Sequence, residues 1–205
     1  MTTIVRLVRH GQTGSNAREA FMGRSNEDLN ETGYNQARRL SARLASLPIA
    51  SAYASPLKRA FMTASVIAEP HRIEVKAVDD FIEIDQGDWA GLPIKEISRK
   101  WPDLWKWSRT DPSDFTMPNG ESFKEVTERS IRAFEQIVAE NQGKQVVIAS
   151  HEIVVKVLLI HALGATNSIY RRFDLDNTSL STIQITDGKM RVAMLNDTSH
   201  LDGLK

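Results

Sequence analysis

The order of strand-like and helix-like segments constrains the fold of this chain more than any other feature. Residues 4–8 (IVRLV) and 146–149 (VVIA) are short apolar runs rich in β-branched residues, which indicates buried strands. Between them, residues 30–47 and 121–140 place apolar side chains at helical spacing, with charged side chains on the opposite face. Strands that alternate with amphipathic helices favour a mostly parallel sheet covered on both faces, so we predict a three-layer α/β/α fold.

Proline, glycine and small polar residues delimit the other elements. The segment 84–120 is the least regular part of the chain, because it holds all four tryptophans and four of the seven prolines. We expect it to be a lid-like excursion over the core. The remaining expected elements are strands at 51–55 and 73–78, helices at 56–68 and 152–163, and a hairpin of strands at 180–186 and 189–195 around Asp187-Gly188.

Length and composition narrow the class of protein. A chain of 205 residues, 41% hydrophobic and 25% charged, is typical of one globular domain, which we expect to span residues 1–205. Lys+Arg 26 balances Asp+Glu 26, whereas a nucleic-acid binder usually carries a basic excess. The absence of cysteine excludes disulfide scaffolds and thiolate chemistry. The N-terminus lacks a signal-peptide pattern and no apolar stretch approaches the ~18 residues of a membrane span, so we expect a soluble, cytoplasmic protein.

Two histidines directly follow the two apolar strands. His10, preceded by Arg9, ends the first strand, and His151 ends the second. In open α/β sheets, ligands bind beyond the carboxyl ends of the strands. One histidine in such a place is as compatible with a structural hydrogen bond as with function. Two at equivalent strand ends, one of them beside an arginine, favour a functional site.

The residues around these histidines belong to a longer ordered pattern. It opens with Arg9-His10-Gly11-Gln12-Thr13 and Asn16, and it closes with residues 177–183 (NTSLSTI). In the segment 23–37, the acidic residue falls at Asp28 or Glu27, slightly displaced from the position that the pattern requires. The pattern spans nearly the whole chain and resembles the signature of the histidine phosphatase superfamily, the phosphoglycerate-mutase-like enzymes. Its inner segments are 23–37 (GRSNEDLNETGYNQA), 55–60 (SPLKRA), 81–91 (FIEIDQGDWAG), 119–122 (NGES) and 149–151 (ASH).

The resemblance implies a phosphoglycerate-mutase-like fold and phosphoryl transfer through a histidine. It makes His10 the nucleophile, which forms a phosphohistidine, and His151 a hydrogen-bond donor to the transferring group. It assigns phosphate binding to Arg9 and Arg59, with Asn16 and the backbone beside Gly11 as neutral donors. Arginine suits this task because it stays protonated and its planar fork matches phosphate oxygens.

A carboxyl group must also act in such a reaction. The leaving alkoxide needs a proton, the water of the second step must lose one, and a single carboxyl can serve both steps. The resemblance selects Glu83, four residues before Gly87. From the residues alone, Asp85 and Asp88 remain alternatives, and Glu83 by itself is as ordinary as any solvated loop carboxylate.

The other histidines and aromatic residues have ordinary interpretations. His71 and His200 are expected at the surface, and His161 lies ten positions after His151, which is no metal-binding pair, so no metal or cofactor is expected. The tryptophan-rich cluster either walls an apolar substrate pocket or, more commonly, forms local core under a long loop. Its members are Trp101, Trp105, Trp107 and Phe115, and the basic residues Lys95, Arg99, Lys100, Lys106 and Arg109 are expected to form a solvated helix face.

Glu152 departs from the family pattern, in which many relatives have glycine after the second histidine. A carboxylate suits the first turn of a helix. Beside a phosphate pocket, however, it would repel a second anionic group. We therefore hypothesise that doubly acidic substrates such as bisphosphoglycerate are disfavoured.

The best-supported function is that of a metal-independent phosphatase, a histidine acid-type phosphomonoesterase acting on a small phosphorylated metabolite. One alternative is a cofactor-dependent phosphomutase, but family mutases tend to carry a longer insertion than the 68 positions between Glu83 and His151. The other is a catalytically silent phospholigand-binding module, which would be expected to lose His10 or Glu83. No nucleic-acid or membrane partner is expected, and the last hairpin and the tryptophan-rich segment are candidate surfaces for a homodimer.

Overall fold

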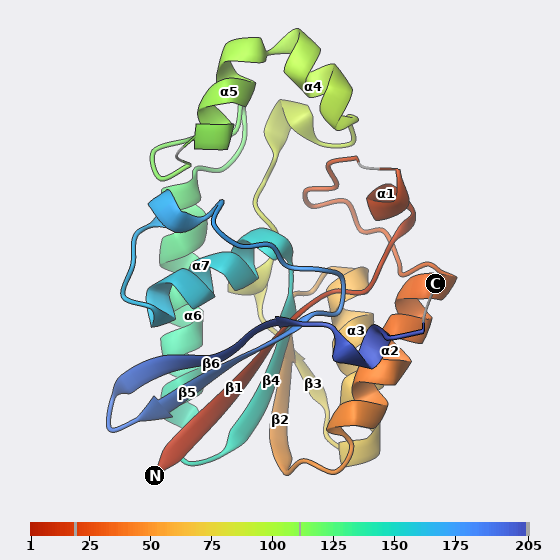
Figure 1. The fold of residues 1–205 in the computed structure, drawn as a ribbon, viewed down its shortest axis with the longest axis vertical. Coiled ribbons are helices and arrows are strands. Elements are labelled where there is room, and N and C mark those ends of the chain that lie inside the picture. The colour runs from red at the N-terminus through yellow and green to blue at the C-terminus, as the bar shows by residue number, and fades with distance from the viewer. Residues whose placement is uncertain (19, 111, 204–205) are drawn as a thin grey trace.

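A six-stranded mixed sheet forms the centre of the computed structural model, which describes residues 1–18, 20–110 and 112–203 (Figure 1). The strand order is β3-β2-β4-β1-β5-β6. The first four strands in this order are parallel, whereas β5 is antiparallel to β1 and β6 is antiparallel to β5. The strands are Thr2–Arg9 (β1), Ile49–Ala54 (β2), Val75–Ala77 (β3), Gln145–Ser150 (β4), Leu180–Thr186 (β5) and Lys189–Asp197 (β6).

Helices cover both faces of the sheet, which confirms the predicted three-layer α/β/α class. α2 (Glu31–Leu44) and α3 (Lys58–Ala68) pack on one face, and α6 (Phe123–Glu140) and α7 (Glu152–Ala162) pack on the other. Successive side chains of a strand point to opposite faces. In β4, Val146 and Ile148 therefore join the α6–α7 core, while Val147 and Ala149 join the α2–α3 core. This double burial explains why the strand is a continuous apolar run.

Local capping and turn chemistry set several element boundaries. The Asn30 side chain accepts a hydrogen bond from Gly33 N (2.8 Å) and caps α2, as the sequence allows. Ser122 and Glu125 form a capping box at the start of α6. The final hairpin has the expected turn, because Asp187 and Gly188 both have positive φ (50° and 74°).

Two boundaries differ from the sequence predictions. Helix α3 begins at Lys58, because Leu57 is extended (φ −67°, ψ 132°) and the Lys58 amide donates to Asn26 Oδ1 at 2.9 Å. Pro56 therefore precedes the helix and does not occupy its first turn. Strand β3 comprises three residues, fewer than the segment 73–78 suggested.

The excursion at 84–120 lies beyond the carboxyl ends of the parallel strands (Figure 1). It contains α4 (Ile94–Lys100) and α5 (Pro102–Thr110), whose bounds the sequence pattern did not reveal. The segment carrying α1 (Gly14–Ala17) is joined to it, because Phe21 N donates to Leu92 O (3.1 Å) and Gly91 N donates to Phe21 O (2.7 Å). The two irregular segments thus meet over the edge of the sheet. Within the described ranges, no helix combines the length and apolar character needed to cross a bilayer.

Candidate active site

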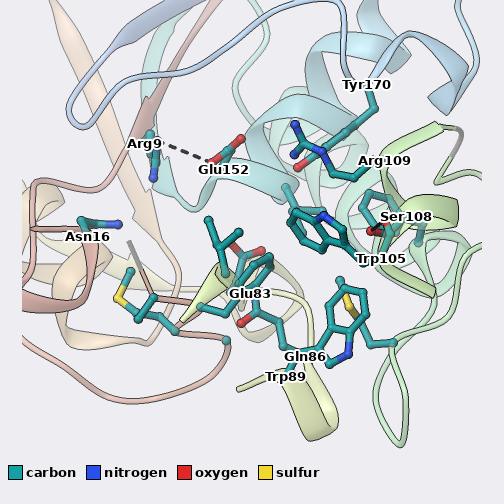
Figure 2. A pocket seen from close by; sticks show the side chains of 18 of the residues that line it. Arg9, Asn16, Glu83, Gln86, Trp89, Trp105, Ser108, Arg109, Glu152 and Tyr170 are labelled. Carbon is teal, nitrogen blue, oxygen red and sulfur yellow. Dashed lines mark hydrogen bonds and ion pairs between the residues drawn. The ribbon is translucent and has the colours of Figure 1, made fainter. Parts of the chain in front are cut away.

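A pocket of about 460 Å³ lies beyond the carboxyl ends of β1 and β4, where the strand pattern predicted a site. Its lining includes five of the predicted site residues, which come from distant parts of the chain. Figure 2 shows Arg9, Asn16 and Glu83 around the pocket, with Glu152 beside Arg9. The five are Arg9, His10, Asn16, Arg59 and Glu83.

His10 is a buried, neutral imidazole with a defined tautomer. Its Nδ1 lies 2.7 Å from Gly11 O, and since a carbonyl can only accept, Nδ1 carries the proton. Nε2 is therefore the unprotonated nitrogen, and its lone pair accepts a hydrogen bond from Arg59 Nε at 3.3 Å, which it must release before it can attack phosphorus. Burial lowers the pKa of His10 well below its usual value, and the charges of Arg59 and Arg9 lower it further. These are the properties of a nucleophilic nitrogen.

Arg59 is a fully buried cation held by a loop. Nη1 donates to Ser25 O at 2.6 Å and Nη2 donates to Gly23 O at 2.8 Å. Burial lowers the pKa of Arg59 to about 10, while the carboxylates of Glu83 and Glu27 oppose that shift, so the guanidinium is still charged at neutral pH. A guanidinium has five N–H groups, so part of the fork remains available to an anion.

Arg9 and Glu152 meet at the edge of the same pocket. Arg9 Nη1 donates to Leu175 O and lies 3.5 Å from Glu152 Oε2. The other carboxylate oxygen of Glu152 lies 3.1 Å from Lys156 Nζ. Burial alone would raise the pKa of Glu152, but Arg9 and Lys156 hold it below its usual value. Glu152 is therefore an ionised carboxylate in the pocket lining.

Burial distinguishes Glu83 from the other two candidate carboxylates, Asp85 and Asp88. Glu83 is 8% exposed and lines the pocket, whereas Asp88 is exposed and Asp85 Oδ1 accepts from Gly87 N at 3.0 Å. Neither aspartate belongs to the pocket lining. Burial raises the pKa of Glu83 to about 7, partly offset by the amide of Ile84, which donates to Oε1 at 2.9 Å. A carboxyl poised near neutrality can both give and take a proton.

Asn16 presents an amide group to the pocket (Figure 2). Its Oδ1 accepts from Thr13 N (3.1 Å) and from Asn177 Nδ2 (3.3 Å). Because the oxygen is already engaged on the protein side, the NH₂ group is the part that remains to donate to a ligand.

The Gly11 amide, predicted to donate to phosphate, is engaged within the protein. Its N–H donates to Thr63 Oγ1 at 3.0 Å, and the residue lies outside the pocket lining. Gly11 also contributes its carbonyl oxygen, which accepts from His10 Nδ1 and so fixes the tautomer of that ring. A side chain is also excluded here, because a Cβ would lie 2.7 Å from Gly33 O.

His151 lies against His10, with a distance of 5.3 Å between the two ring centroids. It is fully buried at the start of α7, and its Nε2 lies 2.8 Å from Ser55 Oγ. Burial lowers the pKa of His151 well below its usual value, and Arg59 adds to this effect. The structure thus brings both predicted histidines together as neutral rings.

A charged network that the sequence analysis did not identify supports Glu83. Glu121 accepts from Arg129 Nε (2.7 Å), from Arg24 Nη2 (3.2 Å) and from the Asp85 amide (3.2 Å). Arg24 Nε in turn donates to the Glu83 carbonyl at 3.2 Å. The network fixes the backbone that carries Glu83. Its sequence signals were the segments 23–37, 81–91 and 119–122, which contain Arg24, Asp85 and Glu121, but nothing local showed that these residues meet.

The tryptophan-rich cluster divides between pocket and core. Trp105 lines the pocket, whereas Phe115 is fully buried in the core, Trp101 is half-buried against the core, and Trp107 is 46% exposed. Arg109 is exposed, as predicted for a solvated helix face, but it also lines the pocket, a placement that the sequence did not indicate. It was not recognisable from sequence because the orientation of α5 depends on how the excursion packs.

The remaining histidines lie outside the pocket lining. His71 and His200 are half-buried, so each is partly exposed, and His200 Nε2 lies 3.3 Å from Thr178 Oγ1. His161 lies 3.4 Å from Glu135. Across residues 1–18, 20–110 and 112–203, no group of three or more histidine, cysteine or acidic residues is arranged to hold a metal ion.

Comparisons with known proteins agree with this geometry. A family model described as the histidine phosphatase superfamily (branch 1) matches residues 5–198. Phosphoserine phosphatase 1 of Hydrogenobacter thermophilus is 32% identical over 195 residues, which cover 95% of this chain and 92% of that protein. A metal-independent phosphoserine phosphatase of Arabidopsis thaliana is 34% identical over 208 residues, covering 100% and 85%.

The solved structure of Bacillus stearothermophilus YhfR superposes with a TM-score of 0.92 at 29% identity and covers 97% of this chain and 99% of that one. Some relatives are longer. The chain spans about half (54%) of the length of a bifunctional protein of Mycobacterium tuberculosis, to which it is 36% identical over 197 residues.

Proposed function

This chain belongs to the histidine phosphatase superfamily, branch 1, and from that premise we propose that it hydrolyses a small-molecule phosphate monoester through a phosphohistidine on His10. One observation carries most of the weight. A neutral His10, with Nε2 as its unprotonated nitrogen, lines a cavity that also holds Arg9, Arg59 and a carboxyl with a pKa near 7. No step requires a metal ion.

In the first step of this proposal, the Nε2 lone pair of His10 attacks phosphorus and the bond to the ester oxygen breaks. Arg9 and Arg59 neutralise the charge on the equatorial phosphoryl oxygens, which is most of what a protein contributes to phosphoryl transfer. Protonated Glu83 gives its proton to the departing alkoxide, so the product leaves as a neutral alcohol.

In the second step, water attacks the phosphorus of the phosphohistidine. The Glu83 carboxylate left by the first step takes the proton of the water, and the bond between nitrogen and phosphorus breaks. Inorganic phosphate leaves, and both His10 and Glu83 return to their starting protonation states. The cycle needs a carboxyl that exchanges its proton near neutral pH, which burial provides at Glu83.

The covalent intermediate provides the direct test. During turnover of p-nitrophenyl phosphate, a neutral denaturing quench followed by intact mass measurement should show one added phosphoryl group, mapped to His10. His161→Ala, which removes a histidine outside the pocket, should behave like the wild type. Phosphate release without any protein adduct would contradict the proposal, and isomerised product without phosphate release would favour a mutase.

Replacing Arg59 with lysine is expected to lower kcat/KM by about 100-fold, even though the charge is kept. A lysine ammonium cannot replace the planar fork that binds Ser25 O, Gly23 O and His10 Nε2 at once. Both the loop and the anion site are therefore held less firmly in the variant. Arg38→Lys, the same change at an exposed arginine, serves as the control. A loss of less than about threefold for Arg59→Lys would contradict the assignment.

Glu152→Gly is expected to increase the relative kcat/KM for doubly acidic phosphoesters, such as phosphoglycerate, over an uncharged-alcohol ester, such as glycerol phosphate, by about tenfold. The ionised Glu152 carboxylate lines the pocket and partly neutralises Arg9, so its removal leaves more positive charge for a second anionic group. Glu152→Gln separates the loss of charge from the loss of side-chain volume. An unchanged substrate ratio in both variants would refute the hypothesis.

A further inference from the structure

The pocket has two chemically different ends. One end holds the phosphate-binding and proton-transfer groups already described. Figure 2 shows Trp105 and Trp89 on the opposite side of the pocket from Arg9 and Asn16. Phe21 also lines the pocket and packs against both tryptophans, so that Phe21, Trp89 and Trp105 form one aromatic wall. A pocket built only for phosphate and a small polar alcohol would not need this apolar wall.

Trp105 is half-buried, as is Phe21, and its neighbours hold it in place. Its ring packs edge-on against Phe21 (6.2 Å between ring centroids) and lies 6.0 Å from the ring of Trp89. The Arg109 guanidinium lies 5.4 Å from the centroid of the Trp105 ring. Fixed in this way, the ring offers part of its surface to the pocket.

The wall is built from two segments that are bonded to each other. The Phe21 backbone exchanges hydrogen bonds with Leu92 and Gly91, and an isolated bridge pairs Ala20 with Pro93. Phe21 and Trp105 therefore hold their spacing without a ligand, which lowers the cost of ordering them on binding.

We propose that the alcohol portion of the substrate carries a bulky apolar group, aromatic or similarly sized, that packs against Trp105 and Phe21 while the phosphate lies at Arg9 and Arg59. This inference rests on the proposed phosphatase function. A cavity of about 460 Å³ is large enough for such an ester, since ligand pockets of roughly 300–1,000 Å³ bury whole drug-sized molecules. A small polar ester would leave the aromatic wall facing water.

The test compares 2-phenylethyl phosphate with ethyl phosphate, because both release a primary alkoxide and differ mainly in the ring. For the wild type we expect kcat/KM to be at least about tenfold higher for the phenylethyl ester, chiefly through a lower KM. Trp105→Ala should reduce this ratio to below about threefold. Trp107→Ala, on the same helix but 46% exposed and outside the pocket lining, should leave the ratio unchanged.

The outcomes separate this inference from the function on which it rests. If neither ester nor any other phosphate monoester is hydrolysed, the proposed phosphatase function fails. If both esters are hydrolysed equally well by the wild type, or if O-phosphoserine is preferred to both, only the apolar-substrate inference is overturned. The wild-type ratio decides the question even if Trp105→Ala does not fold.

A second inference concerns Ser55, which is fully buried beside His151. Ser55 Oγ accepts a hydrogen bond from Leu57 N (3.3 Å) and lies 2.8 Å from His151 Nε2. In the part of the chain that the structure describes, the hydroxyl has no other hydrogen-bond partner, and His151 Nδ1 is buried without one.

Two arrangements of protons are possible for the pair, because a hydroxyl oxygen can accept two hydrogen bonds. If His151 Nε2 donated to Ser55 Oγ, the buried hydroxyl proton would have no acceptor among the described contacts, whereas a hydroxyl that donates to an unprotonated Nε2 leaves only Nδ1–H, on the ring that lies against His10, without a protein partner. We infer that Ser55 is a positioning residue that keeps the proton of neutral His151 on Nδ1, the nitrogen left to donate to the transferring phosphoryl group. If Nδ1 were unprotonated, its lone pair would repel phosphate oxygens.

Imidazole nitrogen NMR of ¹⁵N-histidine-labelled protein tests this inference, with Ser150→Ala as control. Ser150 is equally buried, but its hydroxyl donates to Phe81 O at 2.8 Å and not to a histidine. The wild type and Ser150→Ala should show His151 protonated on Nδ1. Ser55→Ala should shift the proton toward Nε2 and lower kcat at least about tenfold, with a smaller change in KM. A wild-type His151 protonated on Nε2, or a spectrum unchanged in Ser55→Ala, would overturn the inference.

Discussion

Replacing His10 with alanine is expected to reduce kcat/KM for phosphate monoesters by at least about a thousandfold. The variant has no nitrogen to accept the phosphoryl group, while Arg9, Arg59 and Glu83 still bind and polarise the ester. Phosphate binding should therefore survive, and a phosphate or vanadate titration should still report it. The measurement is steady-state phosphate release over a wide range of enzyme concentration.

The variant is also expected to fold. His10 is only 2% exposed, but its neighbours are polar groups rather than core side chains, so no apolar packing is lost. Arg59 Nε loses its acceptor, which costs about 1–3 kcal/mol of unfolding free energy. His161→Ala controls for the loss of a histidine elsewhere. Activity of a folded His10→Ala protein within about tenfold of the wild type would refute the nucleophile assignment.

Replacing Glu83 with glutamine should lower kcat for alkyl phosphates by about 10² to 10⁴-fold. With p-nitrophenyl phosphate, whose leaving group needs little protonation, the first step should suffer less than the second. The phosphohistidine should therefore accumulate, and rapid mixing should show a burst of nitrophenol. Asp88→Asn, at the exposed alternative carboxylate, should keep wild-type kinetics. A large loss in Asp88→Asn and none in Glu83→Gln would reverse the assignment.

The pH dependence follows from the same carboxyl. Burial raises the pKa of Glu83 from 4.5 to about 7, so the protonated form needed in the first step is lost above neutrality. If that step limits turnover of alkyl esters, kcat should fall above pH 7 in the wild type. The fall should be absent in Glu83→Gln, which cannot ionise.

The same substitution that lowers activity, Glu83→Gln, should raise folding stability. Between about pH 4.5 and pH 7 the unfolded chain releases the Glu83 proton while the folded protein retains it, so folding stability falls as pH rises through this window. Glutamine avoids this cost and can keep the hydrogen bond from Ile84 N. Denaturant unfolding at pH 8 should therefore show Glu83→Gln to be more stable than the wild type by about 1–3 kcal/mol. Equal stability at pH 5 and a gap at pH 8 would distinguish this cause from a packing effect.

Much of the fold could be predicted because its signals are local. A strand buried on both faces must be apolar throughout, as β4 is, and a helix on one face of a sheet must be amphipathic, as α6 is. The Asp187-Gly188 turn fixed the last hairpin for a similarly local reason. The bounds of helices α4 and α5 could not be predicted from the sequence. These helices cover the edge of the sheet, so their composition is mixed and shows no simple apolar stripe.

The sequence predicted which residues form the site but not how they are arranged in space. The resemblance assigned Arg9, His10, Arg59, Glu83 and His151, and the structure brings them together. The residues alone could not choose Glu83 over its neighbours, because burial of the carboxyl depends on contacts with distant segments. For the same reason the sequence could not show that the Gly11 amide donates to Thr63.

The sequence by itself determined the alternation of strands and helices and the placement of two histidines at the ends of neighbouring strands, since both are written in short-range patterns. Only the tertiary structure decided which carboxyl is buried, which nitrogen of His10 carries the proton, and that Trp105 and Arg109 face the pocket. These properties depend on desolvation and on hydrogen bonds between residues far apart in the chain, and no local pattern encodes either.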